Sequence, residues 1–96
     1  MITESTVWIF NGNRRKLANL PSAIFSRLEL AEEWIQKTGV TGMLTRYPVD
    51  ISVYDWAISK SYFEPKKEKD HLPAFIETFT SPVQEHYHYE DGQRRS

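Results

Sequence analysis

Four segments of the chain carry the hydrophobic pattern of β-strands. Residues 5–10 are mostly β-branched and aromatic and end at an Asn-Gly-Asn turn, and a shorter apolar run follows at 22–25. Residues 42–48 end at Pro48, which cannot donate to a strand ladder. Residues 83–90 alternate between polar and aromatic positions with the period of two that is typical of a strand. The pattern therefore predicts four strands.

Residues 26–38 instead show the helical period. Apolar side chains fall on one half of the helical wheel, and this face comprises Leu28, Leu30, Ala31, Trp34 and Ile35. Ser26 and Glu29 have the spacing of a capping box, and Gly39 stands where a helix commonly ends. We therefore expect an amphipathic helix with one buried face.

Two further helices are predicted in the second half of the chain. Ser52 and Asp55 repeat the capping-box spacing and start a helix that runs to about Ser61. A charged segment at 65–70 reads as a solvated loop. Pro73 can then occupy the first position of a short helix with apolar residues at 75, 76 and 79.

The elements follow one another in the order β-β-α-β-α-α-β. We expect an α+β fold with a small, mainly antiparallel sheet of about four strands and with helices on one face. Residues 1–96 then form one domain with a core over about 6–91 and a flexible C-terminal tail at 92–96, because a chain of 96 residues has room for a single modest core.

Composition narrows the function classes. The chain has 40% hydrophobic and 26% charged residues, a net charge of −1 and no cysteine, so disulfides and thiolate chemistry are excluded. The balanced charge argues against a nucleic-acid partner, and the basic clusters at 14–16 and 66–69 read as solvated loops. Residues 1–5 lack the pattern of a signal peptide and no apolar run suits a membrane, which predicts a cytoplasmic protein.

The last strand places histidines and a carboxylate on one side. Because strand side chains alternate, His86, His88 and Glu90 share a face, and two imidazoles with a carboxylate can hold zinc, nickel or iron. The simpler interpretation is an exposed polar surface, so we expect no cofactor and no tight metal site. No known catalytic motif is present, which disfavours an enzyme without settling the question.

Thirteen aromatic residues are too many for one small core, which suggests that some of them form an interaction surface. We expect Tyr87 and Tyr89 to face the core. The outer surface would then bind a partner protein through a polar set that Arg46 borders from the neighbouring strand, the predicted residues being His86, His88, Glu90, Asp91 and Arg46.

Several short motifs together carry a resemblance. They are residues 7–10 with Gly12, 31–35, 44–48, 53–58 and 85–92. With them the chain resembles a family of small uncharacterised bacterial single-domain proteins, a domain of unknown function, over residues 6–92. The family implies no activity and no catalytic residue. In size and build the chain is also similar to immunity proteins that neutralise bacterial toxins.

Three functions follow as hypotheses. The first is a non-enzymatic protein-binding module of the bacterial cytoplasm, such as an immunity-like inhibitor of a toxin encoded nearby. The second is a small metal-binding protein or metal-dependent enzyme that uses His86, His88 and Glu90. The third is a homodimeric structural or regulatory module joined through a strand edge or the aromatic face.

Overall fold

The structure is a computed structural model that describes residues 5–14 and 20–95. Residues 1–4, most of the segment that is predicted to carry no secretion signal, lie outside the described residues. Residues 15–16 of the first basic cluster also lie outside them. Within the described part of the chain, no helix is both long and apolar enough to cross a membrane.

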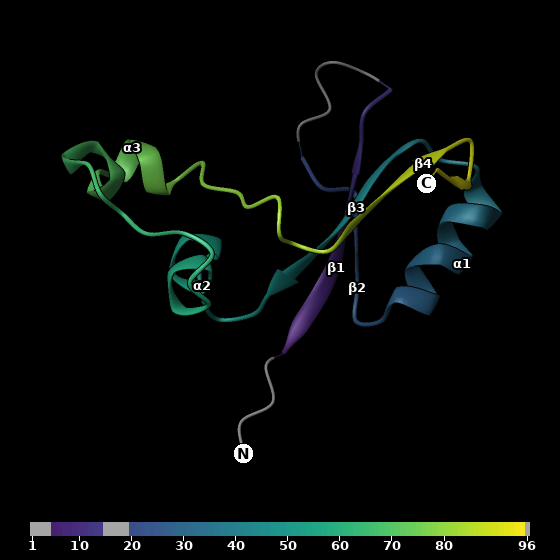
Figure 1. Cartoon of the computed structure of the whole chain (residues 1–96). Helices are drawn as coiled ribbons and strands as arrows, with labels where there is room; N and C mark the ends of the chain where they lie inside the picture. The colour runs from purple at the N-terminus through teal and green to yellow at the C-terminus, as the bar shows by residue number, and fades with distance from the viewer. Residues whose placement is uncertain (1–4, 15–19, 96) are drawn as a thin grey trace.

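The fold is α+β, as predicted, and is built on one open antiparallel sheet (Figure 1). Its strands lie in the order β2-β1-β3-β4-β5, and every neighbouring pair is antiparallel. Their bounds are β1 Thr6–Gly12, β2 Ala23–Phe25, β3 Gly42–Pro48, β4 His86–Glu90 and β5 Gln93–Arg95. The four predicted strands are therefore present, although the last begins only at His86.

A fifth strand, β5, corrects the predicted count of about four. Asp91 and Gly92 have φ angles of 49° and 82°, and they form the two-residue turn of a hairpin. The chain then returns along β4, with Arg94 opposite Tyr89. The three charged or amide side chains of β5 carry no strand pattern, which is why the sequence predicts only a tail here.

Helix α1, Leu28–Thr38, packs on one face of the sheet. Ala31 and Ile35 are fully buried and join a core that β1, β3 and β4 complete with Trp8, Phe10, Leu44 and Tyr89. The helix ends at Gly39 with φ 71°, as predicted. The predicted capping box is wrong, because Arg27 takes the N-cap position and leaves Ser26 one residue too early.

The other helices lie beside the sheet (Figure 1). They are α2 Val53–Ser59, the 3-10 helix Glu68–His71 (η1) and α3 Pro73–Ile76; α2 contacts β3, and α3 contacts η1. Ser52 caps α2 as predicted, since its hydroxyl accepts from the amide of Asp55 at 2.9 Å. The expectation of helices on one face of the sheet therefore holds for α1, whereas α2 and α3 flank the sheet.

A second aromatic cluster forms among these flanking helices. Its rings come from Tyr54, Phe63, Phe75 and Phe79, with centroids 4.9–6.2 Å apart. This cluster accounts for part of the aromatic surplus, because these rings pack on one another outside the core that α1 covers.

The charged segment at 65–70 is not a simple solvated loop. The Asp70 carboxylate is buried and accepts from the backbone N–H groups of Lys66 and Lys67, both at 3.1 Å. These two hydrogen bonds hold the pKa of Asp70 below its usual value. The Tyr54 hydroxyl donates to the Asp70 carbonyl at 2.8 Å, which ties the segment to the aromatic cluster.

Candidate functional site

Strand β4 separates its side chains as the alternation predicts. Tyr89 is buried in the core and Tyr87 packs against it, on the face that α1 covers. His86, His88 and Glu90 are exposed, and the strand pairing puts them on the opposite side of the sheet. The polar trio thus lies together on the sheet surface away from α1.

We call this surface the open face. Cross-strand register assigns to it the side chains of Val7, Ile9, Ile24, Met43, Thr45, Tyr47, His86 and His88. None of them is fully buried, and Ile24 is 65% exposed. A sheet face that leaves several apolar side chains at least partly exposed is unusual for a surface that contacts only water.

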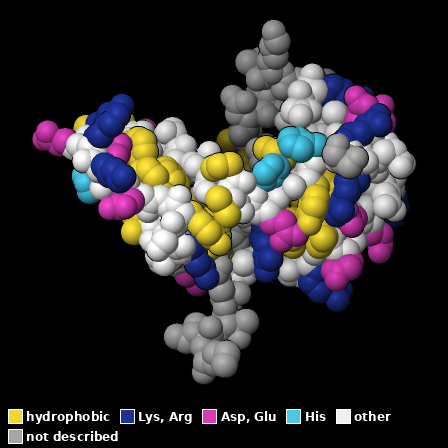
Figure 2. Space-filling view, in the orientation of Figure 1, with side chains coloured by type: hydrophobic (Ala, Val, Ile, Leu, Met, Phe, Trp, Pro, Cys, Tyr) yellow, Lys and Arg dark blue, Asp and Glu magenta, His cyan; other side chains and the backbone are white. Residues whose placement is uncertain are grey.

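The two imidazoles are neighbours on the open face. Their ring centroids lie 5.5 Å apart with the planes at 87°. His86 Nδ1 lies 2.7 Å from the carbonyl oxygen of Gln84, which can only accept, so in the neutral ring Nδ1 carries the proton and Nε2 has the lone pair. Figure 2 shows the histidine side chains together on the surface over β3 and β4, next to hydrophobic ones.

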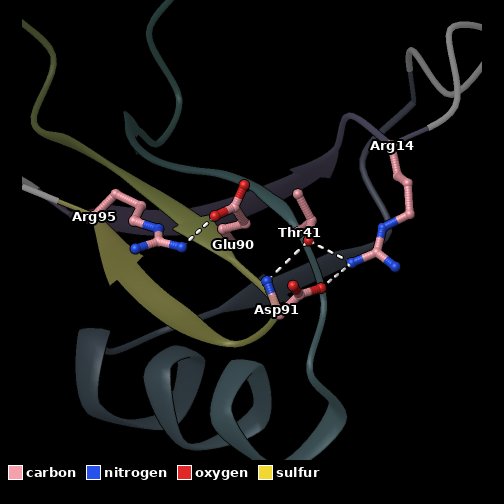
Figure 3. Close-up of polar contacts among 5 residues, drawn as sticks. All are labelled: Arg14, Thr41, Glu90, Asp91 and Arg95. Atoms are coloured by element: carbon pink, nitrogen blue, oxygen red, sulfur yellow. Dashed lines mark hydrogen bonds and ion pairs between the residues drawn. The ribbon is translucent and has the colours of Figure 1, made fainter.

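Glu90 does not extend the histidine pair into a three-ligand cluster. Its carboxylate is hydrogen-bonded to Arg95, which lies beside it across the hairpin (Figure 3). Four residues of extended strand also separate Glu90 from His86, about 13 Å at 3.3 Å per residue. Among residues 5–14 and 20–95, no three His, Asp or Glu side chains are close enough to hold a metal ion.

Asp91 points away from the open face, into a contact at the end of the sheet. Its carboxylate pairs with Arg14 at 2.6 Å, and its backbone N–H donates to the Thr41 hydroxyl at 2.9 Å (Figure 3). Arg14 donates to the same hydroxyl. Asp91 and Arg14 thus neutralise each other in a structural contact that holds the hairpin turn.

Arg46 lies on the other side of the sheet from the histidines, which corrects its expected position. It pairs across the strands with Trp8, and the guanidinium stands 5.9 Å from the centre of that ring. It also donates to Thr6 at 3.0 Å and to Glu85 at 3.2 Å. The sequence could not place it, because the side of the sheet depends on the exact strand register.

Sequence reasoning also missed a stack of charges and rings on the covered face. The Arg94 guanidinium lies 3.8 Å from the ring centre of Tyr87 and pairs with Glu32 at 2.6 Å. Glu32 also accepts from the Tyr89 hydroxyl at 2.7 Å, and burial together with this bond raises the pKa of Tyr89 to about 12. An Asp-Gly hairpin signal followed by a short strand would have placed Arg94 across from Tyr89.

A groove adjoins the open face where the chain enters β4. It encloses about 330 Å³. Its lining combines the open-face side chains with the preceding loop, namely Met43, Thr45, Tyr47, Thr80, Ser81, Pro82, Gln84 and His86. Gln84 holds the loop in place, because its side chain donates to the Arg46 carbonyl and accepts from the Ser81 amide. The open face and this groove form the candidate site.

Comparison with known protein families gives a match over most of the chain. A family model described as "Domain of unknown function (DUF7710)" matches residues 7–95, which include every strand of the sheet but the first residue of β1. No curated protein and no solved structure matches the chain.

Proposed function

The chain belongs to the family described as a domain of unknown function (DUF7710), and from that premise we propose that it is a protein-binding module whose interface is the open face. The observation that carries the proposal is the exposure of Ile24 together with the partly buried Ile9 and Met43 on a sheet face that α1 leaves uncovered. Leaving apolar side chains in water costs about 25 cal/mol per Å², and a partner would recover that free energy.

The polar groups of the open face favour a partner that is different from the chain itself. Glu90 is already bonded to Arg95, and within residues 5–14 and 20–95 no cluster of three His, Asp or Glu side chains includes the imidazoles of His86 and His88. A second copy of the chain would present the same two imidazoles and the same Glu90–Arg95 pair. A partner with an apolar patch and hydrogen-bond donors for the free Nε2 of His86 complements this surface better.

The size of the open face sets the kind of complex. Strands β1 and β3 have seven residues each, so four strands span about 23 by 19 Å, or roughly 430 Å² of flat sheet. A stable interface buries about 800 Å² on each partner. The partner must therefore also reach the groove, which has room for one anchoring side chain of the kind that dominates binding energy.

The partner class that we propose is a bacterial toxin encoded beside this chain, which the chain would inhibit in the cytoplasm as immunity proteins do. The argument for this class is the short chain of 96 residues, a size that resembles that of such inhibitors. A rigid sheet also suits an inhibitor, because it loses little conformational entropy on binding.

Isothermal titration calorimetry with the purified product of the adjacent gene tests the proposal. Ile24→Glu places a charge on the edge strand β2 of the open face, opposite Ile9, and because Ile24 is 65% exposed the fold should tolerate it. We expect a loss of at least about tenfold in affinity, since burying an unpaired carboxylate is costly.

The matched control is Leu72→Glu, at a 51% exposed leucine beside α3, far along the chain from the sheet. It should leave the affinity unchanged. Equal losses in the two variants would remove the interface from the open face, and no binding by the wild type would reject the toxin partner. A concentration-dependent dimer in sedimentation experiments that Ile24→Glu disrupts would favour the homodimer instead.

A further inference from the structure

Met43 lies directly across the strands from His88. The amide of Arg46 donates to the Glu85 carbonyl, so Arg46 and Glu85 form a hydrogen-bonded pair. From this pair onward, non-hydrogen-bonded and hydrogen-bonded pairs alternate along β3 and β4. Thr45 with His86, and Met43 with His88, are consequently non-hydrogen-bonded pairs. In such pairs the Cα atoms are only about 4.5 Å apart and the side chains are closest.

Met43 and His86 also line one groove, and the register makes them diagonal cross-strand neighbours, which lie about 7–8 Å apart. The open face therefore gathers a thioether and two imidazoles within one patch of two strands. Neither imidazole is bonded to a carboxylate, and the neighbouring Arg95 is neutralised by Glu90. A cation at this patch meets no unpaired positive charge among the described residues that face it.

We infer that Met43, His86 and His88 form a site for monovalent copper. Thioether sulfur is a soft ligand that selects Cu(I), and imidazole also suits copper, whereas a zinc site would call for a further hard or thiolate ligand. Three ligands satisfy the low coordination number of Cu(I). The set differs from the sequence-based one, because the structure removes Glu90 and supplies Met43 from the neighbouring strand.

The orientation of His86 supports the assignment. Its Nδ1–H donates to the Gln84 carbonyl, which is the arrangement that metal-binding histidines commonly adopt. That bond fixes the ring and leaves Nε2 as the only atom that can bind a metal. His86 is thus already oriented as a ligand, and this inference does not depend on the proposed protein partner.

The chain offers a direct spectroscopic test, because it has only two methionines, Met1 and Met43. Anaerobic addition of Cu(I) to protein labelled with ¹³C at the methionine methyl groups should shift the Met43 signal with saturation at one equivalent. The Met1 signal is the internal reference. A shift of Met1 without Met43, or of neither, would overturn the site.

Variants separate the thioether from the imidazoles. Competition with a chromophoric Cu(I) chelator should show that Met43→Leu, which preserves an apolar side chain, weakens Cu(I) binding at least about tenfold while weak Zn²⁺ binding through the histidines is unchanged. His88→Ala should weaken both metals, and His71→Ala, at the third histidine of the chain, should weaken neither. Equal Cu(I) affinity in the wild type and Met43→Leu would contradict the inference.

Discussion

The close approach of β1 and β3 at Gly42 allows a sharp test of the sheet register. Gly42 pairs with Gly12, and its position is buried. A Cβ atom at Gly42 would collide with the carbonyl oxygen of Asn11 and would lie 2.7 Å from the ring of Phe10 and 2.9 Å from Cα of Gly12. Two of these obstacles are backbone atoms, so a side-chain rotation cannot relieve the clash.

The cost of Gly42→Ala follows from that geometry. Overpacking a filled core costs about 1–3 kcal/mol and sometimes more. Here the backbones of two strands must separate next to Phe10, which is only 1% exposed, so we expect about 3 kcal/mol. A domain of 96 residues has a free energy of unfolding of roughly 5–14 kcal/mol, so the variant should remain folded but be clearly weakened.

Two other glycines calibrate the measurement. At Gly39 an added Cβ meets open space, and only the left-handed φ of 71° disfavours alanine, by about 1 kcal/mol. At Gly12 the nearest atom would be 3.7 Å away, an ordinary contact, so Gly12→Ala should change the stability by less than about 0.5 kcal/mol.

Urea unfolding followed by tryptophan fluorescence gives these free energies, with unchanged m-values as the sign that the compared states are the same. The predicted order of destabilisation is Gly42, then Gly39, then Gly12. If Gly42→Ala were as stable as Gly12→Ala, the register between β1 and β3 would be wrong.

Three further predictions concern the core and the titrating groups. Ile35→Ala should lower the free energy of unfolding by about 2–5 kcal/mol, because Ile35 is fully buried. Leu30→Ala, on the exposed side of the same helix, should lower it by less than about 1 kcal/mol. Chemical denaturation of the two variants measures the difference. Because the pKa of Asp70 is lowered on folding, the stability that this carboxylate contributes is present above its ordinary pKa of 3.8 and is lost as the pH falls through the lower folded value. Acid unfolding should therefore be steeper in the wild type than in Asp70→Asn. Equal slopes would argue against the buried carboxylate. The pKa of Tyr89 is raised to about 12, so the stability that its protonated hydroxyl contributes to the fold is present below pH 10 and is lost towards pH 12. Tyr89→Phe should flatten this alkaline loss of stability in melting experiments. It should also remove the last phase of the tyrosine absorbance titration.

Local patterns predicted what depends on neighbouring residues. The alternation in β4 gave the correct faces for Tyr87 and His86, and the glycine at 39 gave the correct end of α1. These features follow from the period of the element and from backbone conformation alone.

Features that depend on pairing between distant segments could not be predicted in the same way. The side of the sheet on which Arg46 lies follows from the register between β1 and β3. The position of Met43 next to His88 follows from the register between β3 and β4, 45 residues apart in sequence. The clustering of Phe63 with Phe75 requires a 3-10 helix that the charged segment at 65–70 does not signal.

The central claim is that the open face of the sheet binds a protein partner. Titrating ¹⁵N-labelled chain with the unlabelled product of the adjacent gene, and mapping the amide chemical-shift changes, tests this claim most directly. The account predicts changes concentrated around Ile9, Ile24, Met43 and His86, on both sides of the β1–β3 pair. Changes confined to α1 or to the aromatic cluster, or no changes at all, would contradict it.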